Sequence, residues 1–208
     1  TIGSKELIAL LPTFLQSKTV LYPAVAYPTY LVGALMASAQ PTPVEIDATT
    51  WPVADLAWVN SPSNPTGQVQ SSEQLLAAIN WARKNNSILA SDECYLSFTT
   101  TGKSILALSG GNNSGLLAVH SLSKRSNLAG YRAAFLIGDS KLIDQIRQIR
   151  KHAGLMVPLP VQQAMIAALS ENKHAQEQTQ RYLARGVKLK SALVNAGFTI
   201  EHSEAGLY

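Results

Sequence analysis

The stretch that decides the fold runs from residue 116 to residue 137, with the sequence LLAVHSLSKRSNLAGYRAAFLI. It begins with a short apolar run, 116–119, and ends with a second one, 133–137, and each run is typical of a buried strand. Between them, Lys124 follows the hydroxyl residue Ser121, and Arg132 stands at the mouth of the second run. The pattern therefore predicts a lysine on a loop between two buried strands.

A lysine in this setting has two interpretations. In the first, Lys124 and Arg132 are solvated cations on a surface loop. In the second, Lys124 is partly buried, which is unfavourable unless its charge is paired or its pKa shifts. A lysine of the second kind can form a Schiff base with a carbonyl group. The loop alone leaves both interpretations open.

The composition is that of a globular protein with a large core. Hydrophobic residues make up 46% of the 208 residues and charged residues only 14%, which excludes a disordered chain. The net charge of +4 is dispersed, so no nucleic-acid partner is expected, and a site for an anionic ligand explains the excess equally well. No apolar run approaches the roughly 18 residues that a membrane span needs, so no membrane partner is expected.

The cysteine and histidine residues limit the expected cellular location and the expected chemistry. The single cysteine, Cys94, cannot form an internal disulfide, and a reducing, cytoplasmic location is therefore expected. The four histidines lack the spacing of metal ligands, so no metal site is expected. The chain opens directly before a helix signal and closes just after a strand signal, so we expect it to be a segment of a longer protein.

Strands and helices are expected to alternate along the chain. Apolar runs predict strands at 19–22, 44–46, 56–59, 88–90, 116–120, 133–137 and 198–200. Cap and periodicity signals predict helices over 4–15 (Ser4 at or near the N-cap, Pro12 kinking or shortening it), 29–37, 71–85, 139–153, 161–170 and 172–196. Short continuous apolar strands between helices indicate a mostly parallel sheet covered on both faces. This is a three-layer α-β-α architecture of the α/β class.

In such a sheet, ligands gather at the carboxyl ends of the strands. Six polar residues follow expected strand ends: Tyr27, Asn64, Asp92, Tyr95, Ser121 and Lys124. Gly3 and Ser4 begin a helix whose free N–H groups suit a phosphate, although an ordinary serine cap explains them more simply. These separate segments are expected to converge on one edge of the sheet.

The residues at these positions have the chemistry needed to hold pyridoxal 5'-phosphate. Lys124 would bind its aldehyde as an imine and act as the general base and acid. Asp92 would pair with the pyridine nitrogen and keep it protonated, which makes the ring an electron sink. Tyr95 and Asn64 would hydrogen-bond the phenolic oxygen of the ring. Lys124, Asp92 and Tyr95 are therefore the candidate catalytic residues.

The remaining candidates would hold the phosphate and the ring face. Arg132 would clamp the phosphate together with Ser121 and the chain around Ser4. Tyr27 would stack on the ring. Further candidates for cofactor binding are Gly3, Lys5 and Ser123, and the candidates for substrate binding are Asn64 and Tyr27.

Three motifs resemble those of the class I and II aminotransferases, enzymes of pyridoxal-phosphate fold type I. The stretch 121–134 resembles the family's lysine signature, 64–67 is similar to its N-P-x-G turn, and 92–95 resembles its D-E-x-Y element. The resemblance covers essentially the whole chain. It implies a pyridoxal-phosphate-binding large domain over 1–196 and the start of a small C-terminal domain over 197–208. It also implies a homodimer acting on amino and keto acids, with the N-terminal arm and most of the small domain missing.

A closer resemblance is to succinyldiaminopimelate aminotransferases of the actinobacterial type. It rests on phrases at 2–8, 121–134, 150–154 and 202–208. The resemblance implies glutamate-dependent amination of N-succinyl-2-amino-6-oxopimelate in lysine and diaminopimelate biosynthesis. Two alternatives stay open: another enzyme of the same fold, such as a different transaminase or a carbon–sulfur lyase, and a cofactor-binding sensor domain of a transcription regulator.

Overall fold

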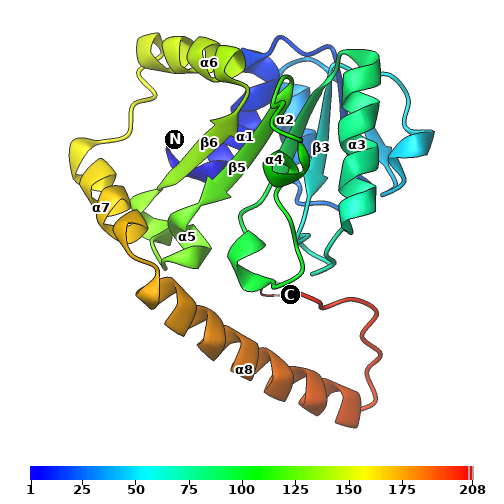
Figure 1. Cartoon of the computed structure of the whole chain (residues 1–208), viewed down its shortest axis with the longest axis vertical. Helices are drawn as coiled ribbons and strands as arrows, with labels where there is room; N and C mark the ends of the chain where they lie inside the picture. The colour runs from blue at the N-terminus through cyan, green and yellow to red at the C-terminus, as the bar shows by residue number, and fades with distance from the viewer. Residues whose placement is uncertain (206, 208) are drawn as a thin grey trace.

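The fold is built on a six-stranded sheet with the strand order β2-β1-β3-β4-β5-β6 (Figure 1). The computed structural model describes residues 1–205 and 207. All neighbouring strands are parallel except β5 and β6, which are antiparallel. This confirms the predicted mostly parallel sheet. The strands are β1 (Thr19–Pro23), β2 (Gln40–Val44), β3 (Leu56–Asn60), β4 (Ile88–Asp92), β5 (Leu116–Ser121) and β6 (Ala134–Gly138).

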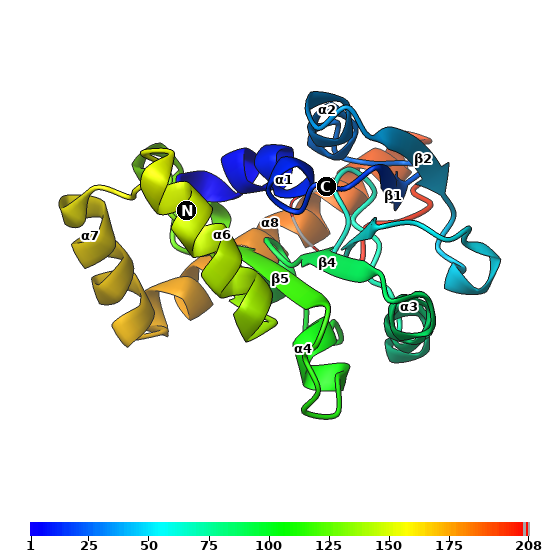
Figure 2. The same ribbon diagram turned by 90° about the horizontal axis from the view of Figure 1, so that it is seen from above.

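Helices cover both faces of the sheet, as Figure 2 shows from above. Elements on one face are α1 (Gly3–Phe14), α2 (Thr29–Met36) and α6 (Ser140–His152), and those on the other are α3 (Ser72–Asn85) and the short α4 (Ile105–Leu108). Each face of the sheet has its own apolar cluster, because both faces of a parallel strand are buried. The predicted three-layer α-β-α class is confirmed.

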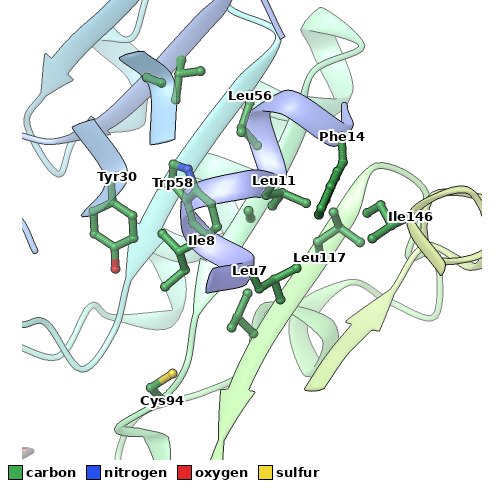
Figure 3. Packing of buried hydrophobic residues seen from close by; sticks show 14 of the residues in the cluster. Leu7, Ile8, Leu11, Phe14, Tyr30, Leu56, Trp58, Cys94, Leu117 and Ile146 are labelled. Carbon is green, nitrogen blue, oxygen red and sulfur yellow. The ribbon is translucent and has the colours of Figure 1, made fainter. Parts of the chain in front are cut away.

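The larger apolar cluster lies between α1 and the sheet. Leu7 and Leu11 of α1, Trp58 of β3 and Leu117 of β5 are fully buried there (Figure 3). Burying one such side chain contributes about 1.5–3 kcal/mol to folding. This packing fixes the start of α1 relative to the carboxyl ends of the central strands.

Helices α3 and α6 both begin with a side-chain cap. Ser71 Oγ accepts a hydrogen bond from the Gln74 N–H at 3.3 Å, and the Gln74 carboxamide oxygen accepts one from the Ser71 N–H at 2.8 Å, so α3 begins with a capping box. Asp139 caps α6 by accepting hydrogen bonds from the N–H groups of Lys141 and Leu142. Both caps satisfy backbone donors that a helix start leaves free.

Two of the predicted strands are wrong. The edge strand β2 spans 40–44 instead of 44–46, and Pro41 and Pro43 lie inside it. Prolines are compatible with β2 because it lies at the edge of the sheet: among the described strands it pairs with β1 alone, and an edge strand tolerates residues that lack an N–H. Residues 198–200 form no strand, because in the described part of the chain this short apolar run has no neighbouring strand to pair with.

The prediction for α1 also needs correction. Its N-cap is Ile2, so Ser4 lies in the first turn and does not cap the helix. Pro12 does not shorten the helix, which ends at Phe14. Pro12 is buried against the core, and only the last residues of the helix follow it.

The last part of the chain leaves the sheet and forms two helices, α7 (Leu159–Ser170) and α8 (Lys173–Asn195), which we call the α7–α8 arm (Figure 1). In α7 no residue is buried, and in α8 only Ala175 is. Gly206 and Tyr208, at the end of the expected small-domain start, lie outside the described residues. Among the residues described, none of the helices is both long enough and apolar enough to cross a membrane.

Candidate active site

A cavity of about 520 Å³ opens at the carboxyl ends of the central strands. Every candidate residue from the sequence except Gly3 lines it, and Gly3 lies directly beside it, next to Arg132. The separate strand ends therefore converge on one edge of the sheet, as expected. The lining residues are Ser4, Lys5, Ile8, Tyr27, Asn64, Asp92, Cys94, Tyr95, Ser121, Ser123, Lys124, Ala129 and Arg132.

Lys124 lies on a single helical turn, α5 (Leu122–Arg125), and not on a loop as the sequence predicted. Ser121, the last residue of β5, is the N-cap of this turn, and its Oγ accepts a hydrogen bond from the Ser123 N–H at 3.1 Å. The serine explains the difference, because a hydroxyl at this position stabilises a helix start. The turn presents Lys124 to the cavity from the strand end.

Asp92 is the last residue of β4 and is buried. The Tyr30 hydroxyl donates to Asp92 Oδ2 at 2.9 Å, and the Cys94 N–H donates to Oδ1 at 3.1 Å. Burial raises the pKa of the Asp92 carboxyl, and the hydrogen bonds from Cys94 and Tyr30 oppose that rise. Each oxygen of the carboxylate thus accepts a hydrogen bond, and Asp92 also lines the cavity.

Sequence reasoning missed Tyr30. This residue is fully buried in α2, and its ring lies 5.2 Å from that of Trp58, between centroids. Burial and the neighbouring Asp92 raise the pKa of the Tyr30 hydroxyl well above its ordinary value, so it remains a donor. No pattern in the sequence could have found this partner, because a buried tyrosine in a helix of small apolar residues is indistinguishable from core packing.

Sequence reasoning also missed Asn60, although a signal existed. Asn60 ends β3 directly beside Asp92, and its Nδ2 donates to the Asp92 carbonyl at 2.9 Å and to the Pro62 carbonyl at 3.1 Å. Its Oδ1 accepts from the Asn64 N–H at 2.8 Å. Asn60 therefore ties the turn that carries Asn64 to the strand that carries Asp92. Its place at a strand end, like that of Asp92, was the available signal.

The start of α1 and Arg132 form a further part of the cavity. Gly3 has φ +73°, and a Cβ atom at Gly3 would lie 2.3 Å from Nη2 of Arg132. The guanidinium therefore occupies the space that any side chain at position 3 would fill. Nη1 of Arg132 donates to the Ala129 carbonyl at 2.7 Å, which orients the group. A glycine, a helix start and an arginine together form a cradle for an anion such as phosphate.

The charges in the cavity favour an anionic ligand with one cationic centre. Lys5, Lys124 and Arg132 line it, and Asp92 is the carboxylate among the described lining residues. The Lys5 ammonium lies 5.7 Å from the centre of the Tyr27 ring, which faces the same cavity. Burial raises the pKa of the Cys94 thiol, opposed by a hydrogen bond from Ser4, so this thiol stays neutral.

This geometry agrees with comparisons to known proteins. The family model described as aminotransferase class I and II matches residues 1–208. The chain belongs to this family. The family expected from the three sequence motifs is thereby confirmed.

Two curated relatives and one solved structure illustrate the likeness. The chain is 47% identical to the 4-dedimethylamino-4-oxo-anhydrotetracycline transaminase OxyQ of Streptomyces rimosus and 45% identical to the probable aminotransferase Rv1178 of Mycobacterium tuberculosis. Both matches cover all of this chain but only 60% and 51% of the relatives, so the chain spans little more than half of their length. A probable N-succinyldiaminopimelate aminotransferase from Thermus thermophilus superposes with a TM-score of 0.86 at 27% identity, over 93% of this chain and 57% of that one.

Proposed function

We propose that this chain is the cofactor-binding part of a pyridoxal-phosphate-dependent transaminase. The observation that carries the proposal is the single cavity that Lys124, Asp92 and Arg132 share. The residues fit the cofactor, because the cradle at Gly3 accepts a phosphate and the buried Asp92 suits a pyridinium nitrogen. Following the family, residues 1–196 would be the large domain and 197–208 the start of the small domain of a homodimer.

Bound pyridoxal phosphate would supply a reactive aldehyde and an electron-withdrawing ring. Lys124 would hold the aldehyde through Nζ and then move a proton with the same atom, as a general base and acid. Asp92, supported by Tyr30 at 2.9 Å, would hold a proton on the ring nitrogen. Tyr95 and Asn64 would bind the ring oxygen, and Tyr27 would cover one face of the ring and exclude water.

The phosphate end would be held by charge and by backbone donors. Arg132 and Lys5 supply positive charge, and the first turn of α1 supplies N–H groups. Ser4, Ser121 and Ser123 would add hydroxyl donors. Each of these residues lines the cavity, so we place the phosphate beside Arg132 and the first turn of α1.

For the substrate, we propose transfer of an amino group from glutamate to N-succinyl-2-amino-6-oxopimelate. One observation supports this choice: similar proteins carry diaminopimelate-related names, including LL-diaminopimelate aminotransferases at 30% identity. The 47% identity to OxyQ favours a second candidate, amination of a tetracyclic ketone.

Replacing Lys124 tests the proposal. Lys124→Ala should remove the absorbance of lysine-bound cofactor and lower turnover by at least about a hundredfold, because the proton-transfer group is lost. Lys151→Ala, at an exposed position on α6, is the matched control and should retain both signals. Turnover of Lys124→Ala near the wild-type rate would refute the proposal.

The substrate is tested by the acceptor preference. With glutamate as donor, amination rates should be compared for the succinylated oxopimelate, an oxo-anhydrotetracycline and simple keto acids. The first candidate predicts the highest kcat/KM for the succinylated compound. A preference for the tetracyclic ketone would establish the second candidate, and indifference to both would reject the two together.

A further inference from the structure

A partly buried ion pair joins α6 to the first turn of α1, beside the candidate active site. Arg150 is only 7% exposed, and its Nη1 lies 2.5 Å from Oε1 of Glu6. Its Nη2 donates to the Leu155 carbonyl at 2.9 Å, and the guanidinium lies 6.0 Å from the centre of the Phe14 ring. Figure 3 shows Phe14 of α1 close to Ile146 of α6, one turn before Arg150. The pair thus belongs to a packed contact between the two helices.

Glu6 stands at an unfavourable place for a site that takes an anion. It follows Ser4 and Lys5, which line the cavity, and its Oε2 accepts a hydrogen bond from the Ile2 N–H at 3.2 Å. A carboxylate in the first turn stabilises a helix through the positive end of the helix dipole. A phosphate at the same helix start would compete for that positive end and would be repelled by the carboxylate.

Arg150 removes this conflict. Its positive charge lies against Glu6 in a partly buried contact, where the pair attracts more strongly than it would in water. The contact also holds the Glu6 carboxylate on the Ile2 N–H, which leaves the N–H groups of the following residues for a ligand. Neither effect requires Arg150 to touch the ligand, and Arg150 does not line the cavity.

We propose that Arg150 is a positioning residue for the phosphate end of the site, which neutralises Glu6 and fixes the first turn of α1 for phosphate binding. This inference rests on the proposed function. It assigns a role to Arg150, which begins the phrase 150–154 of the sequence. Arg150 has no part in the chemistry proposed for Lys124 and Asp92. It also predicts that the effect of Arg150 depends on the ligand's phosphate and on the charge of Glu6.

The test measures dissociation constants of pyridoxal phosphate and of pyridoxal, which lacks the phosphate, in the full-length protein. Arg150→Met should weaken pyridoxal phosphate binding by about tenfold or more, as expected for one uncompensated nearby charge, and should leave pyridoxal binding unchanged. Glu6→Gln combined with Arg150→Met should restore most of the affinity, because both charges are removed. Arg147→Met is the matched control: Arg147 lies on the same helix, paired with Asp144 at 2.9 Å in an exposed contact.

The outcomes separate this inference from the proposed function. Equal weakening for both ligands, or no rescue in the double variant, would reduce Arg150 to a structural residue and overturn the inference. A wild-type protein that binds neither ligand would refute the proposed function itself and the inference with it. If Arg150→Met does not fold, two other variants test the inference: the double variant, which lacks both charges, and Arg150→Lys, which keeps both. Both should then retain the preference for the phosphorylated ligand.

Discussion

The sheet and the α7–α8 arm differ in how far their side chains are buried. All five residues of β3 are buried, whereas no residue of α7 is buried and α8 has only Ala175. Apolar side chains of the arm such as Ile166 and Val187 are exposed by more than half. Helix formation alone therefore does not build a core. The candidate active site is placed on the buried sheet, where packing leaves its residues little freedom.

The arm nevertheless contacts the segment that follows α5, close to Lys124. His174 lies 2.9 Å from Ser126 Oγ, and the Tyr182 hydroxyl donates to Asn127 Oδ1 at 3.2 Å. These partners directly follow α5, the turn that carries Lys124. These contacts are polar, and the Tyr182 ring also lies 5.7 Å from that of Phe98, between centroids. Because no residue of α7 and only Ala175 of α8 is buried, we expect the arm to add little to global stability.

The largest expected difference between the two regions is in the free energy of unfolding that is lost when a large apolar side chain is truncated to alanine. Trp58→Ala should lower the free energy of unfolding by about 3–5 kcal/mol, because Trp58 is fully buried and its loss leaves a cavity. Ile166→Ala in α7, where the side chain is 61% exposed, should change it by about 0.5 kcal/mol or less. Urea denaturation measures both. Equal losses would show that the arm is as tightly packed as the sheet.

A smaller difference, in ligand binding, is expected between alanine variants of two glycines that have the same backbone conformation. Gly3 has φ +73° and Gly154, where the chain leaves α6 for the arm, has φ +74°. Alanine at either position should cost about 1–2 kcal/mol of stability through left-handed strain. Only Gly3→Ala should also weaken phosphate-ligand binding, because its Cβ would displace Arg132, whereas nothing lies within 4 Å of a Cβ at Gly154.

Titration of the ligand distinguishes the glycine variants. Affinity for pyridoxal phosphate should fall in Gly3→Ala and stay at the wild-type level in Gly154→Ala. If both variants bind equally well, Arg132 adapts without loss, and the close approach to Gly3 is not needed for the site.

The smallest expected effects are opposite pH dependences of two carboxylates. Burial raises the pKa of Asp92 above 3.8, so the folded ligand-free protein binds this proton more tightly, and stability falls as pH rises from 3.8 through the folded pKa. Asp92→Asn should remove that fall. In the arm, a hydrogen bond from His174 lowers the pKa of Glu171 below 4.5, so its contribution is present above 4.5 and is lost as pH falls through the folded pKa.

Melting temperatures between pH 3 and pH 7 check these signs. The stability of Asp92→Asn relative to wild type should increase with pH, and that of Glu171→Gln should decrease. A parallel pH dependence of the two variants would contradict the assignment of Asp92 to a buried and Glu171 to an exposed setting.

Most of the sheet was predictable from the sequence, because buried strands need continuous apolar runs and such runs are visible at 56–59, 88–90 and 116–120. The prediction was wrong at β2, where prolines are tolerated only because the strand lies at the edge. Position in the sheet is a tertiary property, so the residues of β2 do not reveal it. For the same reason, the apolar run 198–200 has the pattern of a strand but no pairing partner among the described strands.

What the sequence by itself determined is which chemistry is available: Lys124 and Asp92 follow expected strand ends, and the rule for parallel sheets brings such ends together. Arg132 stands at the mouth of the next expected strand. Only the tertiary structure decided which groups support them. Tyr30 reaches Asp92 across 62 residues, and Arg150 reaches Glu6 across 144. Such contacts depend on the packing of α2 and α6 on the sheet, and the periodicity of a helix shows which face is buried but not what that face will meet.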